Sequence, residues 1–172
     1  MLIVDTARRL ARDVYVERRL FEILGAWSSE ASDDEAVRLF AVQSRHHGEQ
    51  AEWFAELQPV LHDVDDALLA PPAALVEYLG AVAAATGDEL RLVGLVEVVL
   101  PELLADHEAA LASTNESADG PVVRVRRRVL LGAQEDWRAA TQVLQGGHWP
   151  GGDAEGSAAH RSVLQTLARA AR

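Results

Sequence analysis

The chain has 172 residues, of which 49% are hydrophobic, and it carries a formal net charge of −11 at pH 7. This length allows one domain with one buried core. The acidic balance argues against a nucleic-acid partner, because a phosphate backbone would be repelled. The sequence contains no cysteine, which excludes disulfide bonds, a thiolate nucleophile and a cysteine-bound metal.

The distribution of charge predicts a cytoplasmic protein without a membrane segment. No run of about 18 uncharged apolar residues is present, and the N-terminus lacks the apolar core of a signal peptide. All 16 basic residues are arginine, which is typical of a GC-rich genome. Residues 124–128, RVRRR, are expected to form a solvated, salt-bridged helix face.

Apolar residues recur at helical spacing along most of the chain, and no segment shows the alternation of a strand. The second helix begins with a capping-box pattern, Ser32 followed by Glu35, and ends before Pro59. The predicted helices cover residues 3–27, 37–57 with its preceding cap, 73–85, 88–113, 121–145 and 157–170.

Four of these helices are long, and their lengths and connections predict the architecture. Short turns join the first helix to the second and the third to the fourth, which predicts two antiparallel hairpins. A connection of nearly thirty residues with a short helix links the hairpins. The expected fold is therefore one all-α domain, residues 1–172, with a bundle at 3–145. A flexible connector at 146–156 precedes a C-terminal helix at 157–170.

Polar side chains interrupt the apolar faces near the middle of the long helices, where a core would be expected. They are Glu17, Gln43, His47, Gln50, Glu97 and Asp136. A buried carboxylate without a partner is costly. These residues therefore either share one central polar site or form separate buried ion pairs, for which Arg126 is a candidate cation.

The motifs at residues 15–25 (YVERRLFEILG), 44–53 and 135–137, together with the helix order, resemble the ferritin-like superfamily. In particular, the chain is similar to short actinobacterial members with two adjacent histidines in the second helix. The resemblance covers about residues 4–145 and implies a ferritin-like four-helix bundle. Metal-binding members place one Glu on each of two helices and a Glu-x-x-His pair on each of the other two. Those carboxylates and histidines hold two iron or manganese ions.

The chain departs from that ligand pattern on two helices. Glu17 and Glu97 match the lone acids, but Gln43 stands where the second helix needs an acid before His46. The fourth helix has Glu135 and Asp136 without a histidine three residues later. The ligands expected for a single metal are Glu17, His47 and Glu97. Alternates are His46, Glu49 and Glu135.

Two functions fit these observations, and the sequence leaves open whether the protein is an enzyme. The first is a binding protein whose central polar site takes a small molecule or at most one metal, with no firmly bound cofactor. The second is a non-haem iron oxidoreductase or hydroxylase. A second copy of the chain is a candidate partner. Pro101 predicts a kink that leaves the Glu97 carbonyl unpaired, because proline has no N–H to donate to it.

Overall fold

The computed structural model describes residues 3–60, 69–117, 119–147, 149 and 154–172, and within them all regular structure is helical. The prediction of an all-α fold is confirmed for this part of the chain. The helices are α1 (Ile3–Glu30), α2 (Asp34–Glu56), α3 (Ala73–Ala83), α4 (Asp88–Gly94), the π-helical turn η2 (Leu95–Val99), α5 (Leu100–Ser113), α6 (Gly120–Gly146) and α7 (Ala154–Ala170).

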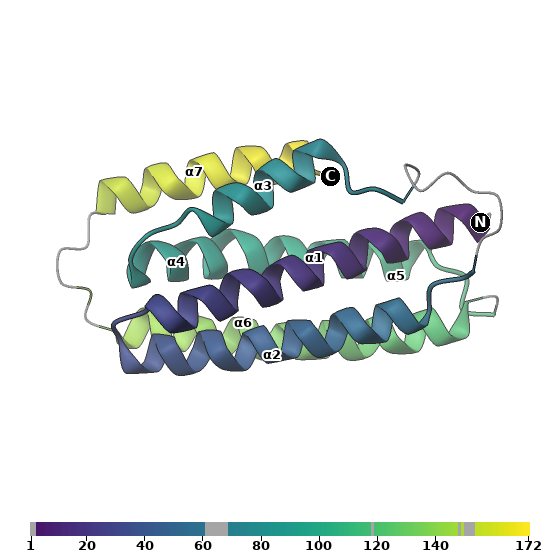
Figure 1. Cartoon of the computed structure of the whole chain (residues 1–172), viewed down its shortest axis with the longest axis horizontal. Coiled ribbons are helices and arrows are strands. Elements are labelled where there is room, and N and C mark those ends of the chain that lie inside the picture. The colour runs from purple at the N-terminus through teal and green to yellow at the C-terminus, as the bar shows by residue number, and fades with distance from the viewer. Residues whose placement is uncertain (1–2, 61–68, 118, 148, 150–153) are drawn as a thin grey trace.

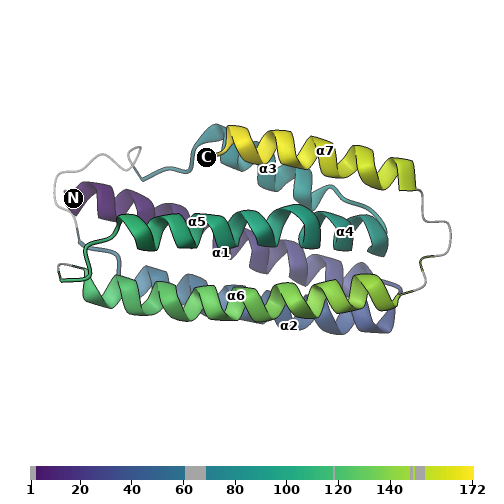
Figure 2. The ribbon, with the colours of Figure 1, turned by 180° about the vertical axis from the view of Figure 1, so that it is seen from behind.

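Four rods run side by side along the long axis of the molecule (Figure 1). They are α1, α2, α6 and the continuous rod α4–η2–α5, and the view from behind shows the same arrangement (Figure 2). α1 packs on α2, α5 packs on α6, and α2 also contacts α6. α3 and α7 pack on each other outside these rods. The acidic segment around residues 62–66 lies outside the described residues.

The turn between α1 and α2 is held by acids, although the predicted capping box is wrong. The N-cap of α2 is Asp33, whose side chain accepts hydrogen bonds from the backbone N–H groups of Glu35 and Ala36. The backbone N–H and the hydroxyl of Ser32 instead donate to Asp88 Oδ2, both at 2.9 Å. Burial would raise the pKa of Asp88, but hydrogen bonds from the backbone N–H of Asp33 and from Ser32 outweigh it and lower that pKa. Asp88 thus ties the first hairpin to the start of α4.

The rod that contains Pro101 has a π-helical turn at Leu95–Val99, where a kink was predicted. In a π turn each N–H bonds the carbonyl five residues earlier, so Pro101 leaves Val96 without its donor. The indole Nε1 of Trp137 on α6 donates to that Val96 carbonyl at 2.9 Å. The Val96 carbonyl therefore finds its partner outside the helix. The unpaired Glu97 carbonyl stays a prediction.

Two apolar clusters fill the bundle, and they position the polar residues between them. The larger cluster includes Leu24, Phe40 and Leu100, and extends under α3 and α7. The smaller cluster comprises Leu10, Val14, Phe54 and Val129 near the other end. In α1 the buried Glu17 lies between residues of these two clusters. A central polar layer is therefore enclosed by apolar packing on both sides.

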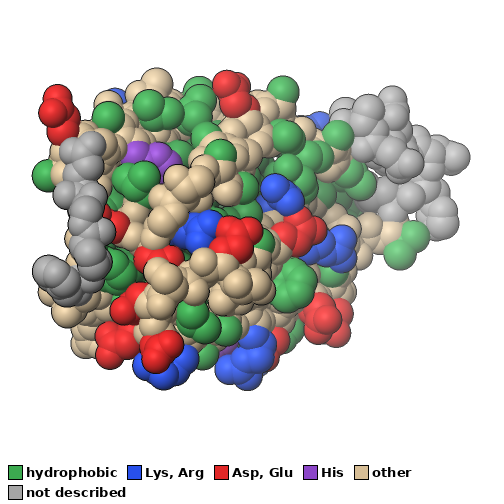
Figure 3. All heavy atoms as spheres, turned by 60° about the vertical axis from the view of Figure 1, so that its left-hand side comes forward, with side chains coloured by type: hydrophobic (Ala, Val, Ile, Leu, Met, Phe, Trp, Pro, Cys, Tyr) green, Lys and Arg blue, Asp and Glu red, His purple; other side chains and the backbone are tan. Residues whose placement is uncertain are grey.

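The outside of the molecule carries charges of both signs. On the face shown in Figure 3, Asp and Glu side chains lie beside Arg side chains. Among the described residues, no helix is both long and apolar enough to cross a membrane.

α7 begins at Ala154, slightly earlier than the predicted start, and packs on α3 and α4.

Candidate functional site

A single carboxylate, that of Glu17 on α1, lies at the centre of the polar layer and is fully buried. His47 of α2 places its Nδ1 2.5 Å from Glu17 Oε2. His107 of α5 places its Nε2 3.6 Å from Glu17 Oε1, which is beyond hydrogen-bond distance but close enough for electrostatic attraction. One acid thus joins two histidines from two other helices, as the stripe positions of Glu17 and His47 predicted.

Arg126 of α6 extends this contact across the bundle. Its Nη1 donates to Nδ1 of His107 at 2.9 Å, and its Nη2 donates to Asp13 Oδ2 of α1 at 2.5 Å. The result is a continuous buried series, Asp13–Arg126–His107–Glu17–His47, which we call the polar chain. It contacts all four rods. A polar chain of this length in a bundle core fixes the register of the helices, because each displaced member would leave a buried charge unpaired.

The ring of Phe54, which belongs to the smaller apolar cluster, packs directly against the polar chain. Phe54 stacks on His107 with ring centroids 5.9 Å apart, and the guanidinium of Arg126 lies 5.3 Å from the same ring. A cation over an aromatic face is attracted by the ring quadrupole. This contact partly compensates Arg126 for its loss of water.

The environment of Glu17 holds it in the ionised form. Burial would raise the pKa of Glu17, but its close contacts with His47 and His107 outweigh this effect and lower the pKa to about 2. The central acid of the site is therefore a carboxylate at any physiological pH. It can accept protons in hydrogen bonds but cannot donate one.

The partners of the two histidines determine which ring nitrogen carries a proton. Because ionised Glu17 only accepts, Nδ1 of His47 must be its protonated nitrogen. Because Arg126 only donates, Nδ1 of His107 must be bare, and its proton lies on Nε2, which faces Glu17. The two histidines therefore have opposite tautomers, and Nε2 of His47 is the nitrogen that remains open.

Three polar residues of α2, one of them His47, lie on the same face of the helix. Gln43 precedes His47 by four residues and Gln50 follows it by three, so all three lie on one side of the helix. Gln43 Oε1, His47 Nε2 and Gln50 Oε1 are buried and have no hydrogen-bond partner among the described residues. Glu17 Oε1 is a fourth such atom. The unpaired atoms on this face of α2 and at Glu17 are therefore acceptors, whereas buried donors without a partner lie at other positions, at Trp27 Nε1 and Arg126 Nε.

Asp136 of α6 is buried as predicted, but it forms a second pair. His46 Nδ1 lies 2.9 Å from Asp136 Oδ1, and the amide of Gln43 donates to the Asp136 backbone carbonyl at 2.7 Å. His46 is half-buried, as its place beside the main stripe suggested. This pair joins α2 to α6 next to the polar chain.

The expectation that Glu97 shares a site with Glu17 and His47 is wrong. Glu97 lies in η2, its side chain is 34% exposed, and it forms an ion pair with Arg161 of α7. The π turn adds a residue to the helical period and so rotates this part of the rod. Two alternate ligands also lie elsewhere: Glu49 pairs with Arg45, and Glu135 is exposed.

Sequence reasoning missed Asp13 and His107 as site residues and named Arg126 only as a partner for an acid. A signal was present for both. Asp13 precedes Glu17 by four residues and so lies on the same face of α1. His107 falls on the apolar stripe of the third long helix, where a polar residue is as unexpected as Glu17.

The polar groups do not form the ligand set of a metal centre with several acidic or histidine ligands. Within the described residues, no group of three or more His, Asp or Glu side chains is arranged to hold a metal ion. Comparisons with protein-family models, curated proteins and solved structures found no match for the chain. The ferritin-like resemblance thus remains a prediction, and function is argued from the site.

Proposed function

We propose that this protein is a ligand-binding helical bundle whose interior takes one cation, anchored on Nε2 of His47. The observation that carries the proposal is the set of buried acceptors without donors on the inner face of α2 and at Glu17 Oε1. A buried acceptor without a donor costs about 1–3 kcal/mol, so several in one layer favour an occupant that supplies positive charge.

The formal charges of the interior support the same conclusion. Asp13, Glu17 and Asp136 are buried carboxylates, and Arg126 is a buried guanidinium that pairs with Asp13. With neutral histidines this layer is anionic. A single divalent ion would neutralise it, whereas protonation of His47 would neutralise it only in part. The carboxylate–histidine contact between Glu17 and His47 is also the arrangement that orients a histidine for a metal.

A two-metal centre of the ferritin-like kind does not fit these residues. His107 cannot offer Nε2 as a neutral ligand, because Arg126 occupies its Nδ1 and the proton lies on Nε2. Glu97 is paired with Arg161, and Asp136 is paired with His46. The helix order supports a ferritin-like bundle, but we derive no oxygenase or hydroxylase reaction from it. Iron or manganese enters the proposal only as a single ion.

Metal loading tests the proposal directly. The protein is loaded anaerobically with ferrous iron, and separately with zinc, and the bound metal per chain is measured by plasma mass spectrometry after desalting. We expect one equivalent, held by His47, since one histidine and one carboxylate with amide oxygens leave no ligands for a second ion. Binding should weaken as the pH falls, because a proton competes for His47 Nε2.

Matched variants locate the ion. His47→Ala should abolish binding, whereas His46→Ala, the adjacent histidine with its own carboxylate, should leave one equivalent. Circular dichroism would confirm that both variants stay helical. Two tightly held equivalents in the unaltered protein, or no metal at saturating concentration, would each contradict the proposal.

A further inference from the structure

We propose that a groove between α1 and α5, separate from the central site, binds a small dianion such as a phosphate group or a dicarboxylate. The groove has a volume of about 240 Å³. Its charged lining residues are Arg9, Arg12, Asp13, Asp106, Arg126 and Arg172. Four arginines against two aspartates make this lining positive, on a chain whose formal net charge is −11.

The contacts of these arginines show which charge is available. Arg126, at 1% exposure, forms the floor and pairs with Asp13. Arg12 pairs with Asp106 at 2.9 Å, so these two pairs are internally neutral. The side-chain contact of Arg9 is the hydroxyl of Ser113 at 2.8 Å, which carries no charge.

Arg172 supplies the second available charge. It pairs at 2.5 Å with Glu102, which does not line the groove. The Arg172 side chain is more than half exposed, so water screens this pair and the guanidinium can turn to a ligand at small cost. Arg9 and Arg172 thus offer two positive charges to an occupant. A dianion matches them.

The floor of the groove has an unsatisfied donor of its own. The Nε of Arg126 is buried and has no hydrogen-bond partner among the described residues. A buried donor without an acceptor is uncommon, so the floor would gain from a nearby anion. Guanidinium groups are also the side chains best suited to the planar, two-pronged recognition of phosphate and carboxylate.

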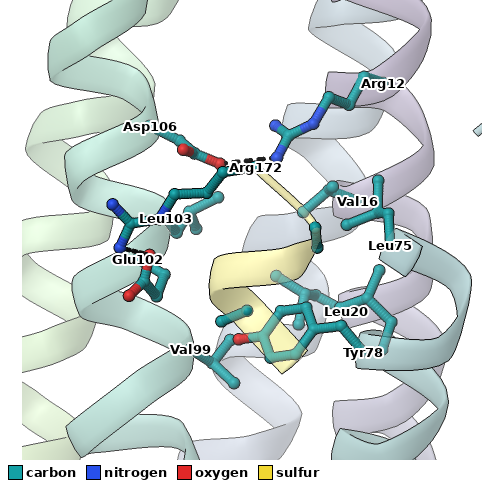
Figure 4. Close-up of a pocket in the computed structure, with 13 residues that line it drawn as sticks. Arg12, Val16, Leu20, Leu75, Tyr78, Val99, Glu102, Leu103, Asp106 and Arg172 are labelled. Carbon is teal, nitrogen blue, oxygen red and sulfur yellow. Dashed lines mark hydrogen bonds and ion pairs between the residues drawn. The ribbon is translucent and has the colours of Figure 1, made fainter. Parts of the chain in front are cut away.

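A neighbouring cavity limits how far a ligand could extend. Figure 4 shows Arg12, Asp106 and Arg172 along one edge of this cavity, with Tyr78 and apolar side chains behind them. The cavity measures about 30 Å³, which is room for one or two waters. An apolar tail does not fit there. An apolar tail is therefore excluded on this side of the groove, and the two available charges favour a compact polar dianion.

The groove is also smaller than the pockets of about 300–1,000 Å³ that hold drug-sized ligands. Inorganic phosphate and succinate are the probes that match its size and charge. Titration of the full-length protein by calorimetry should show saturable binding of at least one of them, with one site per chain and a Kd on the order of 1 mM or tighter. Binding should weaken as sodium chloride is raised.

Two variants that each remove one arginine charge distinguish binding in the groove from a general electrostatic effect. Arg9→Gln should weaken dianion binding about tenfold, because it removes one charge-assisted contact. Arg19→Gln removes the same charge from α1 at a residue that pairs with Glu22 outside the groove, and it should change binding less than twofold. Arg172→Gln is a second test at an exposed terminus, should Arg9→Gln fail to fold.

The proposal would be overturned by three results: no saturable binding of either dianion, equal loss in Arg9→Gln and Arg19→Gln, or acetate binding as tightly as succinate. Arginine Nε signals in ¹⁵N spectra give an independent location, and those of Arg9 and Arg172 should shift on titration. His47→Ala should retain dianion binding. The proposals for the groove and for the central cation site can therefore be contradicted independently.

Discussion

Nδ1 of His47 lies 2.5 Å from Oε2 of Glu17, and both side chains are buried at the centre of the bundle. The contact joins α1 to α2, and His107 brings α5 to the same carboxylate. Removing one partner of a buried charged pair commonly costs about 3–5 kcal/mol, because the other partner is left uncompensated. The pair therefore contributes to the stability of the fold.

The first prediction concerns acid stability. The pKa of Glu17 is lowered from 4.5 to about 2 in the folded protein. A lowered pKa stabilises the fold above the unfolded value, and this contribution is lost as the pH falls from about 4.5 towards 2. The loss is on the order of 3 kcal/mol. Urea unfolding of the unaltered protein through this window should show it.

Glu17→Gln is the matched control for that experiment. The variant should be less stable at neutral pH and should lose much less stability on acidification, since it has no acid to protonate at this position. Equal acid sensitivity of the two proteins would show that other carboxylates dominate.

Glu97→Gln, unlike Glu17→Gln, should change the stability of the protein only slightly. The Glu97–Arg161 pair is more than a third exposed on the Arg161 side, so solvent screening limits its contribution to about 0–1 kcal/mol. We expect a small change in unfolding free energy and no change in metal stoichiometry. Loss of bound metal in this variant would restore Glu97 to the central site and contradict the structure.

The third prediction tests how the bundle accommodates Pro101. Trp137→Phe keeps an aromatic ring but removes the N–H that bonds the Val96 carbonyl, at a cost of about 1 kcal/mol. In a Pro101→Ala background the restored N–H can satisfy a carbonyl of η2, so Trp137→Phe should cost less. A double-mutant cycle by urea unfolding measures the coupling. Equal costs in both backgrounds would argue against this role for the indole.

Two glycines predict opposite effects of an added methyl group. A Cβ at Gly94 would lie 3.0 Å from Leu164 Cδ1 and 3.3 Å from His160 Nε2, so Gly94→Ala should loosen α7. A Cβ at Gly80 would meet nothing within 4 Å, so Gly80→Ala should stabilise the protein by about 0.5–1 kcal/mol. Hydrogen exchange of the α7 amides should rise in Gly94→Ala alone. Unchanged protection there would show that α7 adjusts without loss.

Glu17 and Glu97 show where helical periodicity predicts burial correctly and where it does not. Both acids interrupt an apolar stripe, and regular 3.6-residue spacing correctly placed Glu17, His47, Gln43 and Gln50 inside. It failed at Glu97 because the π turn breaks the period there. A single sequence offers no local signal that distinguishes a π turn from a proline kink.

The side-chain pairs between different helices were harder to predict than the buried face of each helix. The stripe of α6 correctly placed Asp136 inside, but Arg126 is buried although residues 124–128 were predicted to form a solvated face. Nor can periodicity say that Arg126 would choose Asp13 and His107. Nor could it pair Glu97 with Arg161, since α7 followed a connector expected to be flexible. Such pairings depend on rotation and height of packed helices, which are set by the whole core.

The open Nε2 of His47 is the central claim, and histidine ¹⁵N spectra during a zinc titration test it most directly. A His46→Gln background removes the neighbouring histidine. Before zinc, His47 should be protonated on Nδ1 and His107 on Nε2. With zinc, the His47 Nε2 signal alone should shift and saturate at one equivalent. An unshifted His47 signal at saturating zinc, or a bare Nδ1 on His47, would contradict the account.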